Sequence, residues 1–310
     1  MSTHFDLTPL NEYKSNKSKN DLRLGDKVSS FEASQHILLG YPDDQGIKLN
    51  GGRVGASLGP DCARKYLYKM TQNPFNTHEI KLHDQGNLKI SSDLAKNHET
   101  AKENVLNLLG QNKKVISVGG GHDYAYPDGA GFLQYCKKNN LKRPLIINID
   151  AHLDVRPTSN GLTSGTPFFR LTEEFNDFDL YEIGIQSQCN SLEHVQWCKS
   201  KGIQILNYDE IISSGLSFAQ IATRFLGNAL LKPRPCFLSI DIDAFSSSFA
   251  MGCSQSWPTG LSPEPFFQWL DIIKSRTQIY NLGIYELSPP LDLDDRTSKL
   301  VAQIIYRYLQ

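Results

Sequence analysis

Short apolar segments alternate with longer amphipathic segments along most of the chain. In the short segments, aliphatic residues follow one another instead of alternating with polar residues. Such continuous runs are typical of parallel strands that are covered on both faces of a sheet. The pattern therefore predicts seven strands, at residues 36–41, 115–118, 145–149, 181–185, 203–206, 237–242 and 280–285.

The amphipathic segments predict helices, most clearly at residues 92–110, 262–276 and 295–309. We expect Ser92 to cap the first of these helices and Gly110 to end it, because these residue types commonly start and stop helices. Ser262 and Pro263 mark the start of the second helix, since Ser is a favourable N-cap and Pro fits the first turn.

The alternation of strands and helices is not interrupted by any linker rich in Pro, Gly or Ser. It predicts a single three-layer α/β/α domain, in which helices cover both faces of a mostly parallel sheet. We place this domain at residues 36–310. Residues 11–30 are polar and rich in Lys, so we interpret residues 1–35 as an N-terminal arm or surface segment.

The composition is that of a globular protein that binds neither nucleic acid nor membrane. The chain has 310 residues, of which 39% are hydrophobic and 21% are charged, as in ordinary globular enzymes. Its net charge of −1 provides no general attraction to nucleic acids or anionic membranes. No apolar run approaches the roughly 20 residues that a membrane-spanning helix requires. We therefore expect a small-molecule ligand, with neither nucleic acid nor membrane as a partner, and the sequence also allows a homo-oligomer.

Six cysteines are scattered along the chain without a Cys-x-x-Cys pair. In a chain of this length, that spacing indicates reduced thiols and not a disulfide framework or a zinc site. The N-terminal segment "MSTHFDLTPLNEYKSNKSKN" also lacks the apolar core of a signal peptide. Both observations favour a cytoplasmic protein.

Residues that can bind metal ions lie at or just after the ends of three of the predicted strands. They are His122 and Asp123 in "VISVGGGHD", Asp150, His152 and Asp154 in "LIINIDAHLD", and Asp241 and Asp243 in "FLSIDIDAF". Ligands of open parallel sheets bind beyond the carboxyl ends of the strands. Alternate residues of an extended chain share a face, so we expect the members of the two later groups to point the same way.

Four carboxylates and two imidazoles at one edge of a sheet predict a centre for two metal ions. Without a cation, neighbouring carboxylates repel one another and their pKa values rise. Six ligands exceed the three that a catalytic zinc ion typically takes from the protein, whereas two ions that share bridging carboxylates fit the number. A ligand set without thiolate favours Mn²⁺. Taken singly, "GGGHD" could be a glycine turn and "SIDID" a strand with solvated acids, but the three motifs together favour the binuclear centre.

The motifs "GGGHD", "NIDAHLD" and "SIDIDAF", in this order, resemble those of the ureohydrolase superfamily, which includes arginase, agmatinase, guanidinobutyrase and formimidoylglutamase. The resemblance extends from "NGGRVGASLGPDCARKYL" (50–67) to "YELSPPLD" (285–292). It implies an arginase-like fold with two Mn²⁺ ions per chain, which Asp150 and Asp241 bridge. The remaining ligands that it implies are His122 and Asp154 for one ion, and His152 and Asp243 for the other.

The resemblance also implies a reaction. Two cations lower the pKa of a water molecule between them, so that a bridging hydroxide attacks the planar carbon of an amidine or guanidine. Glu286 aligns with the superfamily glutamate that holds the NH₂ groups of the cationic substrate through paired hydrogen bonds. Asp154 would bind metal and also pass a proton to the leaving nitrogen. The superfamily usually has Glu-x-Asn-Pro at this place, whereas this chain has Ser288 in the position of the Asn.

Two positions bear on the substrate. Arginase and agmatinase carry a His before the glycine of an "HG-x-P" turn, where this chain has Ser164, and arginase has a small amide residue where this chain has Arg156. Together with "LRLGD" (22–26), these residues resemble the formimidoylglutamase branch. N-formimidoylglutamate carries an amidine at one end and two carboxylates at the other. Arg156 can clamp such a carboxylate with two hydrogen bonds, and it would repel cationic arginine or agmatine.

Other interpretations of these positions stay open. Arg156 could neutralise the nearby acids or lie in solvent, and Ser164 could be a plain turn residue. Further candidates for substrate contacts are Arg53, Arg170, Asn190 and Ser191.

We therefore predict a hydrolase of linear amidines that converts N-formimidoyl-L-glutamate and water to L-glutamate and formamide in histidine degradation. One alternative is a ureohydrolase of the arginase, agmatinase or guanidinobutyrase type, which releases urea from another guanidino compound. A second alternative is a catalytically silent relative that binds a ligand or a partner subunit. A binuclear phosphoesterase is disfavoured, because its Asp-x-His motif comes first and is followed by a Gly-Asp-x-x-Asp motif that this sequence lacks.

Overall fold

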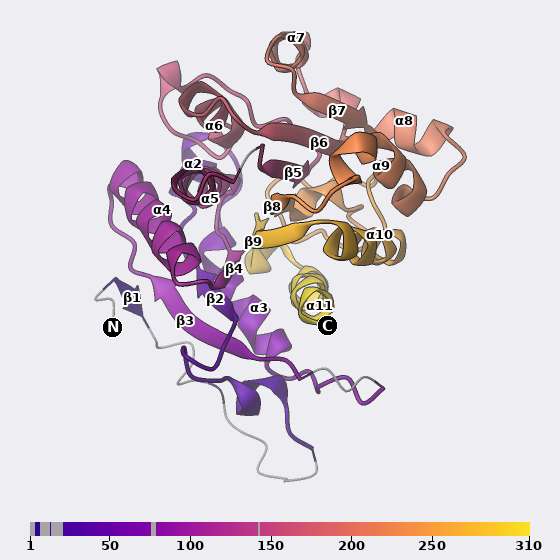
Figure 1. The fold of residues 1–310 in the computed structure, drawn as a ribbon. Coiled ribbons are helices and arrows are strands. Elements are labelled where there is room, and N and C mark those ends of the chain that lie inside the picture. Colours follow the sequence, from indigo (N-terminus) through magenta and orange to yellow (C-terminus); the bar gives the residue numbers. More distant parts are fainter. Residues whose placement is uncertain (1–3, 7–12, 14–20, 76–78, 142) are drawn as a thin grey trace.

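A nine-stranded sheet forms the centre of the computed structural model, which describes residues 4–6, 13, 21–75, 79–141 and 143–310 (Figure 1). The strand order is β1-β3-β2-β4-β9-β8-β5-β6-β7, and every neighbouring pair is parallel except β1 with β3. The strands are β1 (Phe5–Asp6), β2 (His36–Gly40), β3 (Leu82–Leu88), β4 (Lys114–Val118), β5 (Leu145–Ile149), β6 (Asp179–Ile185), β7 (Gln204–Asn207), β8 (Pro235–Asp241) and β9 (Gln278–Tyr285).

Helices cover both faces of the sheet, which confirms the predicted three-layer α/β/α architecture. Helices α4, α5 and α6 lie on one face, and α3, α9, α10 and α11 lie on the other (Figure 1). The helices are α2 (Gln45–Leu49), α3 (Gly59–Leu67), α4 (Leu94–Gly110), α5 (Ala125–Lys138), α6 (Pro167–Glu174), α7 (Leu192–Ser200), α8 (Tyr208–Ser213), α9 (Phe218–Leu226), α10 (Pro263–Arg276) and α11 (Arg296–Leu309). Within the described part of the chain, none of these helices is long and apolar enough to cross a bilayer.

All seven predicted strands are present, each with bounds within two residues of the prediction, and α4, α10 and α11 confirm the three predicted helices. The predicted cap of α4 is wrong by one residue. Asp93 occupies the N-cap, where its side chain accepts a hydrogen bond from the backbone N–H of Lys96 at 3.0 Å. Ser92 lies one position too early to reach that donor, because an N-cap side chain bonds the N–H groups two or three residues ahead.

Strand β3 was not predicted, because its sequence "LHDQGNL" is largely polar. The polar residue Asp84 is nevertheless buried in it, and the guanidinium of Arg64 from α3 pairs with both of its carboxylate oxygens. The distances are 2.8 Å from Nε to Oδ2 and 3.0 Å from Nη2 to Oδ1. This bidentate ion pair compensates the buried charge of Asp84. The pattern of apolar residues does not reveal such a pair.

The two faces of the sheet differ in the polarity of their buried side chains just before the carboxyl ends of the central strands. On the face covered by α9, α10 and α11, the buried side chains of β5 are Leu145, Ile147 and Ile149. On the opposite face, Ile146 is followed by the buried Asn148, and Ser239 of β8 is the register partner of Asn148. Buried polar side chains therefore lie side by side on two neighbouring strands, one step before the loops that extend from the sheet.

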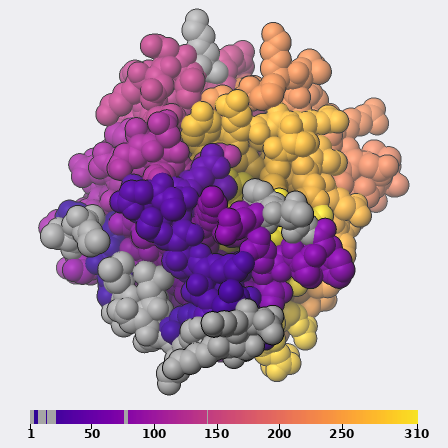
Figure 2. Space-filling model, turned by 60° about the horizontal axis from the view of Figure 1, so that its bottom comes forward, coloured from indigo at the N-terminus to yellow at the C-terminus, as the bar shows by residue number. Residues whose placement is uncertain are grey.

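The N-terminal part of the chain packs against the domain where it is described. In Figure 2, residues before about 100 occupy the centre and lower part of the face shown, beside the yellow C-terminal residues. Leu24 is buried, and Arg23 forms an isolated bridge with Thr71. Much of residues 1–20 lies outside the described residues, so the proposed boundary between residues 35 and 36 stays a prediction.

Candidate metal centre

The expected ligands lie at the carboxyl ends of β4, β5 and β8, where Asp241 is the last residue of β8 and the others occupy the turns that follow the strands. Strand β5 ends at Ile149, and Asp150, His152 and Asp154 belong to the loop that follows. Asp243 lies in a 3₁₀ turn directly after β8. The extended chain on which the expected alternation rests therefore ends with the strands, although the ligand side chains do come together. The turns bring the side chains together instead, because they fold the chain back over the end of the sheet.

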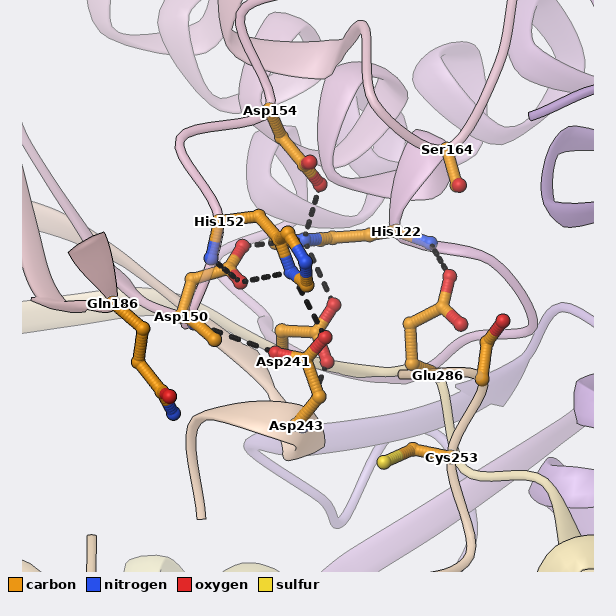
Figure 3. A network of polar contacts seen from close by, with 12 residues as sticks. His122, Asp150, His152, Asp154, Ser164, Gln186, Asp241, Asp243, Cys253 and Glu286 are labelled. Carbon is orange, nitrogen blue, oxygen red and sulfur yellow. Dashed lines mark hydrogen bonds and ion pairs between the residues drawn. The ribbon is translucent and has the colours of Figure 1, made fainter. Parts of the chain in front are cut away.

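His122 is the centre of the first group of ligand atoms (Figure 3). Its Nδ1 lies 3.0 Å from Oδ2 of Asp150, 3.0 Å from Oδ2 of Asp154 and 3.2 Å from Oδ2 of Asp241. The four residues offer ligand atoms that all lie within 4.8 Å of one another, which is close enough to surround one metal ion. His122 and Asp150 are completely buried.

His152 is the centre of a second group, which shares Asp150 with the first. Its Nδ1 lies 3.0 Å from Oδ2 of Asp243 and 3.6 Å from Oδ1 of Asp150. Asp150, His152 and Asp243 also offer ligand atoms within 4.8 Å of one another. Because Asp150 presents Oδ2 to the first group and Oδ1 to the second, its carboxylate can bridge two ions.

The local chemistry fits divalent cations at these two positions. Three carboxylate oxygens lie within 3.2 Å of the buried Nδ1 of His122, yet none accepts a hydrogen bond from it. Burial, followed by the neighbouring carboxylates of Asp243 and Asp150, raises the pKa of Asp241 well above its usual value. Burial and the carboxylate of Asp150 also raise the pKa of Asp154. A cation removes this repulsion, and oxygen and imidazole donors without thiolate suit Mn²⁺.

Ser239 supports the first group, although it is not among the residues predicted from the sequence. Its hydroxyl lies 2.9 Å from Nε2 of His122, so that it fixes the ring and leaves Nδ1 directed toward the carboxylates. Partners of this kind orient metal-binding histidines and hold their tautomer. The sequence contained a signal for it, because Ser239 precedes Asp241 by two residues and lies on the same face of β8.

Two acids in the site have an uncommon backbone conformation. Asp154 has φ of 48° and Glu286 has φ of 66°, whereas residues other than glycine seldom have positive φ. Glu286 follows β9 directly, and its Oε1 accepts a hydrogen bond from the backbone N–H of His122 at 3.1 Å. Burial, followed by the charge of Asp241, raises the pKa of Glu286 well above its usual value. Such strain is typical of functional sites, where the surrounding structure maintains it.

Comparison with known proteins identifies the family. The Arginase family model matches residues 34–310. The chain belongs to the arginase family. Formimidoylglutamase of Staphylococcus carnosus (strain TM300) is 30% identical over 276 residues, which cover 88% of this chain and 85% of that protein. Formimidoylglutamase of Streptococcus pyogenes serotype M3 (strain SSI-1) is 30% identical over 293 residues, which cover 91% of this chain and 86% of that protein.

Solved structures agree with this assignment. The crystal structure of Trypanosoma cruzi formiminoglutamase with Mn²⁺ is similar with a TM-score of 0.80 and 27% identity, and the match covers 93% of this chain and 97% of that chain. The crystal structure of formimidoylglutamase from Bacillus subtilis gives a TM-score of 0.84 at 23% identity, over 98% of this chain and 97% of that chain. At that lower identity, the likeness supports the arginase fold alone.

In this arginase-family chain, four of the six ligand residues line a pocket with a volume of about 540 Å³, namely His152, Asp154, Asp241 and Asp243. Arg156 lies on the pocket wall, exposed to solvent, and forms no ion pair with any described residue. Its predicted alternative role of neutralising the nearby acids therefore has no support among the described contacts. Ser164 also lines the pocket, and its hydroxyl accepts a hydrogen bond from Nδ2 of Asn50 at 3.1 Å.

Some of the further candidates for substrate contacts line the pocket, and others hold the chain around it. Asn190 and Ser191 line the pocket. Asn190 also holds the ligand loop, because its Oδ1 accepts from the backbone N–H of Leu153 at 2.8 Å. Arg53 instead donates to the carbonyl oxygens of Ser254 and Cys253, at 2.9 Å and 3.1 Å.

Asp123 and Arg170 lie behind the site and do not line the pocket. Oδ2 of Asp123 is 2.7 Å from Nε2 of His98, and Nη1 of Arg170 is 2.9 Å from Nδ1 of the same ring. Arg170 also stacks on Tyr126, with Cζ 3.3 Å from the ring centroid. These contacts lie outside the pocket and give no support to the interpretation of Arg170 as a contact for a substrate carboxylate.

Ser288, the departure from the usual Glu-x-Asn-Pro, is completely buried beside Glu286. Its backbone N–H donates to the carbonyl oxygen of Gly252 at 2.7 Å. This backbone bond ties the segment after Glu286 to the chain near residue 252.

Proposed function

We propose that this chain is a binuclear manganese hydrolase that converts N-formimidoyl-L-glutamate and water to L-glutamate and formamide. The observation that carries the proposal is the pair of ligand groups that share Asp150, beside a pocket that Glu286 and Arg156 line. The formimidoylglutamase relatives and the Mn²⁺ in the Trypanosoma cruzi protein support the substrate and the metal.

The proposed ligands of the two ions follow from the two groups. His122, Asp150, Asp154 and Asp241 would hold one ion, and Asp150, His152 and Asp243 would hold the other. Asp241 is proposed as a second bridge on the resemblance to the superfamily. When bound, the ions supply a nucleophile derived from water at neutral pH and compensate the charge of the carboxylates.

Glu286 and Asp154 would act on the amidine itself. The cationic amidine presents two N–H groups in one plane, and a carboxylate accepts such a pair through charge-assisted hydrogen bonds. One oxygen of Glu286 is fixed by the N–H of His122, so its carboxylate orientation is set before substrate binds. Asp154 lines the same pocket and would deliver a proton to the glutamate nitrogen as its bond to the formimidoyl carbon breaks.

Arg156 would select the acidic end of the substrate. Its guanidinium has no ionic partner among the described residues and lies on the pocket wall, so it is available for a substrate carboxylate. Bidentate pairing of guanidinium with carboxylate provides both affinity and orientation. A cationic substrate without a second carboxylate would gain nothing from this residue. Ser164 and Asn190 are the proposed neutral contacts.

The same proposal places the protein in the cytoplasm, within histidine degradation. All six cysteines are free thiols, and four of them are buried. Free thiols are maintained in the reducing cytosol.

A substrate comparison tests the function. The Mn²⁺-loaded protein is incubated separately with N-formimidoyl-L-glutamate, arginine, agmatine and guanidinobutyrate, while glutamate, formamide and urea are measured. We expect glutamate and formamide from the first compound and urea from none. Urea from arginine without glutamate release would identify the alternative ureohydrolase. Uptake of Mn²⁺ without any hydrolysis would identify a silent relative.

Variants connect the activity to the centre. Asp241→Asn is expected to lower the manganese content and abolish hydrolysis. The matched control is Asp271→Asn, which changes an exposed aspartate of α10 that pairs with Arg307. It should keep two ions per chain and the activity of the unmodified protein.

A further inference from the structure

Glu182 on β6 is a buried carboxyl group for which the proposed reaction has no role. Its side chain is 0% exposed and does not line the pocket. Oε2 accepts one hydrogen bond, from Nδ2 of Asn148 at 2.8 Å, and Oε1 forms none with any described residue. Burial raises the pKa of Glu182 well above its usual value. An apolar side chain would serve folding at least as well here, so the carboxyl group indicates another purpose.

Asn148 links Glu182 to the candidate metal centre. It is the register partner of Glu182 on the neighbouring strand β5, and it lies on the same face as Asp150, two residues further on. Its Nδ2 donates both to Oε2 of Glu182 and to Oδ2 of Asp150, at 2.8 Å and 3.2 Å. The reversed amide would turn its oxygen toward the carboxylate of Asp150, which disfavours that orientation. Glu182 thus holds the NH₂ group toward Asp150.

The orientation of Asp150 matters for both ligand groups. Its Oδ1 accepts from the backbone N–H of His152 at 2.7 Å, and its Oδ2 accepts from Asn148. The same Oδ2 lies 3.0 Å from Nδ1 of His122, and Oδ1 lies 3.6 Å from Nδ1 of His152. Each carboxylate oxygen of Asp150 therefore accepts a hydrogen bond from a donor of its own. Loss of either donor frees the carboxylate to rotate away from the orientation that serves two ions at once.

We propose that Glu182 is a positioning residue that acts through Asn148 to fix the bridging orientation of Asp150. It touches neither the substrate nor a metal ligand directly. The inference rests on the proposed function, because it assumes that Asp150 bridges two Mn²⁺ ions. Outer partners of metal ligands typically change metal affinity by about ten- to a hundredfold when they are removed.

Manganese binding is the direct test. Equilibrium dialysis with Mn²⁺ gives the Kd and the number of ions per chain, and electron paramagnetic resonance detects the coupled ion pair. Glu182→Met is expected to raise the Kd about ten- to a hundredfold and to weaken the coupled signal. Glu182→Gln keeps an oxygen acceptor for Asn148 and is expected to retain the Kd of the unmodified protein. If Glu182→Met does not fold, Glu182→Leu replaces it.

A double-mutant cycle tests whether Glu182 acts through Asn148. Asn148→Leu should weaken Mn²⁺ binding as much as Glu182→Met does. The double variant should bind no more weakly than Asn148→Leu alone, because residues of one network are not additive. Additive losses would overturn the proposal, since Glu182 would then act independently of Asn148.

The matched control is Ile183→Ala. Ile183 neighbours Glu182 in β6, is completely buried and packs in the core on the opposite face. It should destabilise the strand without changing the Kd for Mn²⁺. An equal loss of Mn²⁺ affinity in Ile183→Ala would overturn the inference, because general loosening of β6 would then explain the effect.

The outcomes separate this inference from the proposed function. Failure of the unmodified protein to bind an ion pair would remove the proposed function itself. Two ions in the unmodified protein, with an unchanged Kd in Glu182→Met, would remove only the positioning role of Glu182.

Discussion

The carboxylate of Glu286 accepts a hydrogen bond from the backbone N–H of His122, with 3.1 Å between Oε1 and N, although 164 positions separate the two residues. The contact joins the ends of β9 and β4, which are neighbouring strands of the sheet. The backbone N–H of Glu286 also donates to the carbonyl oxygen of Gly120 at 2.8 Å. The sheet therefore holds Glu286, which is proposed to bind the substrate, and His122, a proposed metal ligand, in one fixed arrangement.

Glu286→Gln tests the charge of this acid while its shape is kept. Gln retains an oxygen that can accept from the N–H of His122, but it no longer faces the cationic amidine with a negative charge. A hydrogen bond to a charged group contributes about 1.5–3 kcal/mol, so kcat/KM for N-formimidoylglutamate should fall about ten- to a hundredfold. Steady-state kinetics measures this loss, and elemental analysis should still find two manganese ions per chain.

Glu264→Gln is the matched control for this loss. Glu264 is an exposed acid in the first turn of α10 and does not line the pocket. Its replacement should leave kcat/KM unchanged. A variant Glu286→Gln with the kinetics of the unmodified protein would show that Glu286 does not hold the substrate.

Arg156→Ala tests the recognition of the acidic substrate. Loss of the bidentate pair should raise KM for N-formimidoylglutamate about tenfold or more, with little change in manganese content. Arg156→Lys should give an intermediate KM, because a lysine keeps the charge but loses the planar pair of donors.

The control for Arg156 is Arg224→Ala, which removes an exposed arginine of α9 outside this pocket. Its KM should match that of the unmodified protein. If Arg156→Ala instead loses its manganese, Arg156 supports the structure of the centre and does not select the substrate.

The sequence predicted the central strands because parallel strands buried on both faces are continuous apolar runs. It also predicted six candidate ligands at the ends of three of those runs, and the structure brings these six side chains together in two groups. It did not reveal β3, in which Arg64 neutralises the buried Asp84, since that pairing joins residues 20 positions apart. It did not reveal α5 either, where Pro127 interrupts the helical pattern.

The finer geometry of the site also depends on contacts across strands. The partnership of Ser239 with His122 spans 117 positions, and that of Asn148 with Glu182 spans 34. A local pattern can mark Ser239 as a neighbour of Asp241, but it does not show which distant residue Ser239 or Asn148 contacts. The positive φ of Asp154 likewise follows from the packing around its loop and not from its residue type.

The N-cap of α4 offers a test, because substitutions of two adjacent residues should destabilise the fold by different amounts. Asp93→Ala removes the acceptor for the N–H of Lys96 and should destabilise the fold by about 1 kcal/mol. Ser92→Ala is the matched control and should have a smaller effect, because Ser92 does not cap α4. Thermal unfolding measures both variants. Equal destabilisation would contradict the assignment of the cap to Asp93.

Asp128 provides a test of pH dependence away from the metal ligands. It is completely buried and accepts hydrogen bonds from the hydroxyl groups of Tyr41 and Tyr285, at 2.6 Å and 2.5 Å. Burial raises its pKa to about 6, against the opposing effect of those hydrogen bonds. A carboxyl group with a raised pKa in the folded state stabilises the fold fully below its unfolded pKa. That contribution is lost as the pH rises through the folded pKa.

For Asp128 this window extends from about pH 4 to just above pH 6, and the loss amounts to about 3 kcal/mol. Asp128→Asn removes the titration but keeps the size of the side chain. The stability of the Mn²⁺-loaded protein relative to Asp128→Asn should therefore decline across this window, as measured by denaturant unfolding at a series of pH values. Asp271→Asn, on the surface of α10, should show no such change relative to the unmodified protein. Parallel profiles for the unmodified protein and Asp128→Asn would mean that the pKa of Asp128 is not raised by folding.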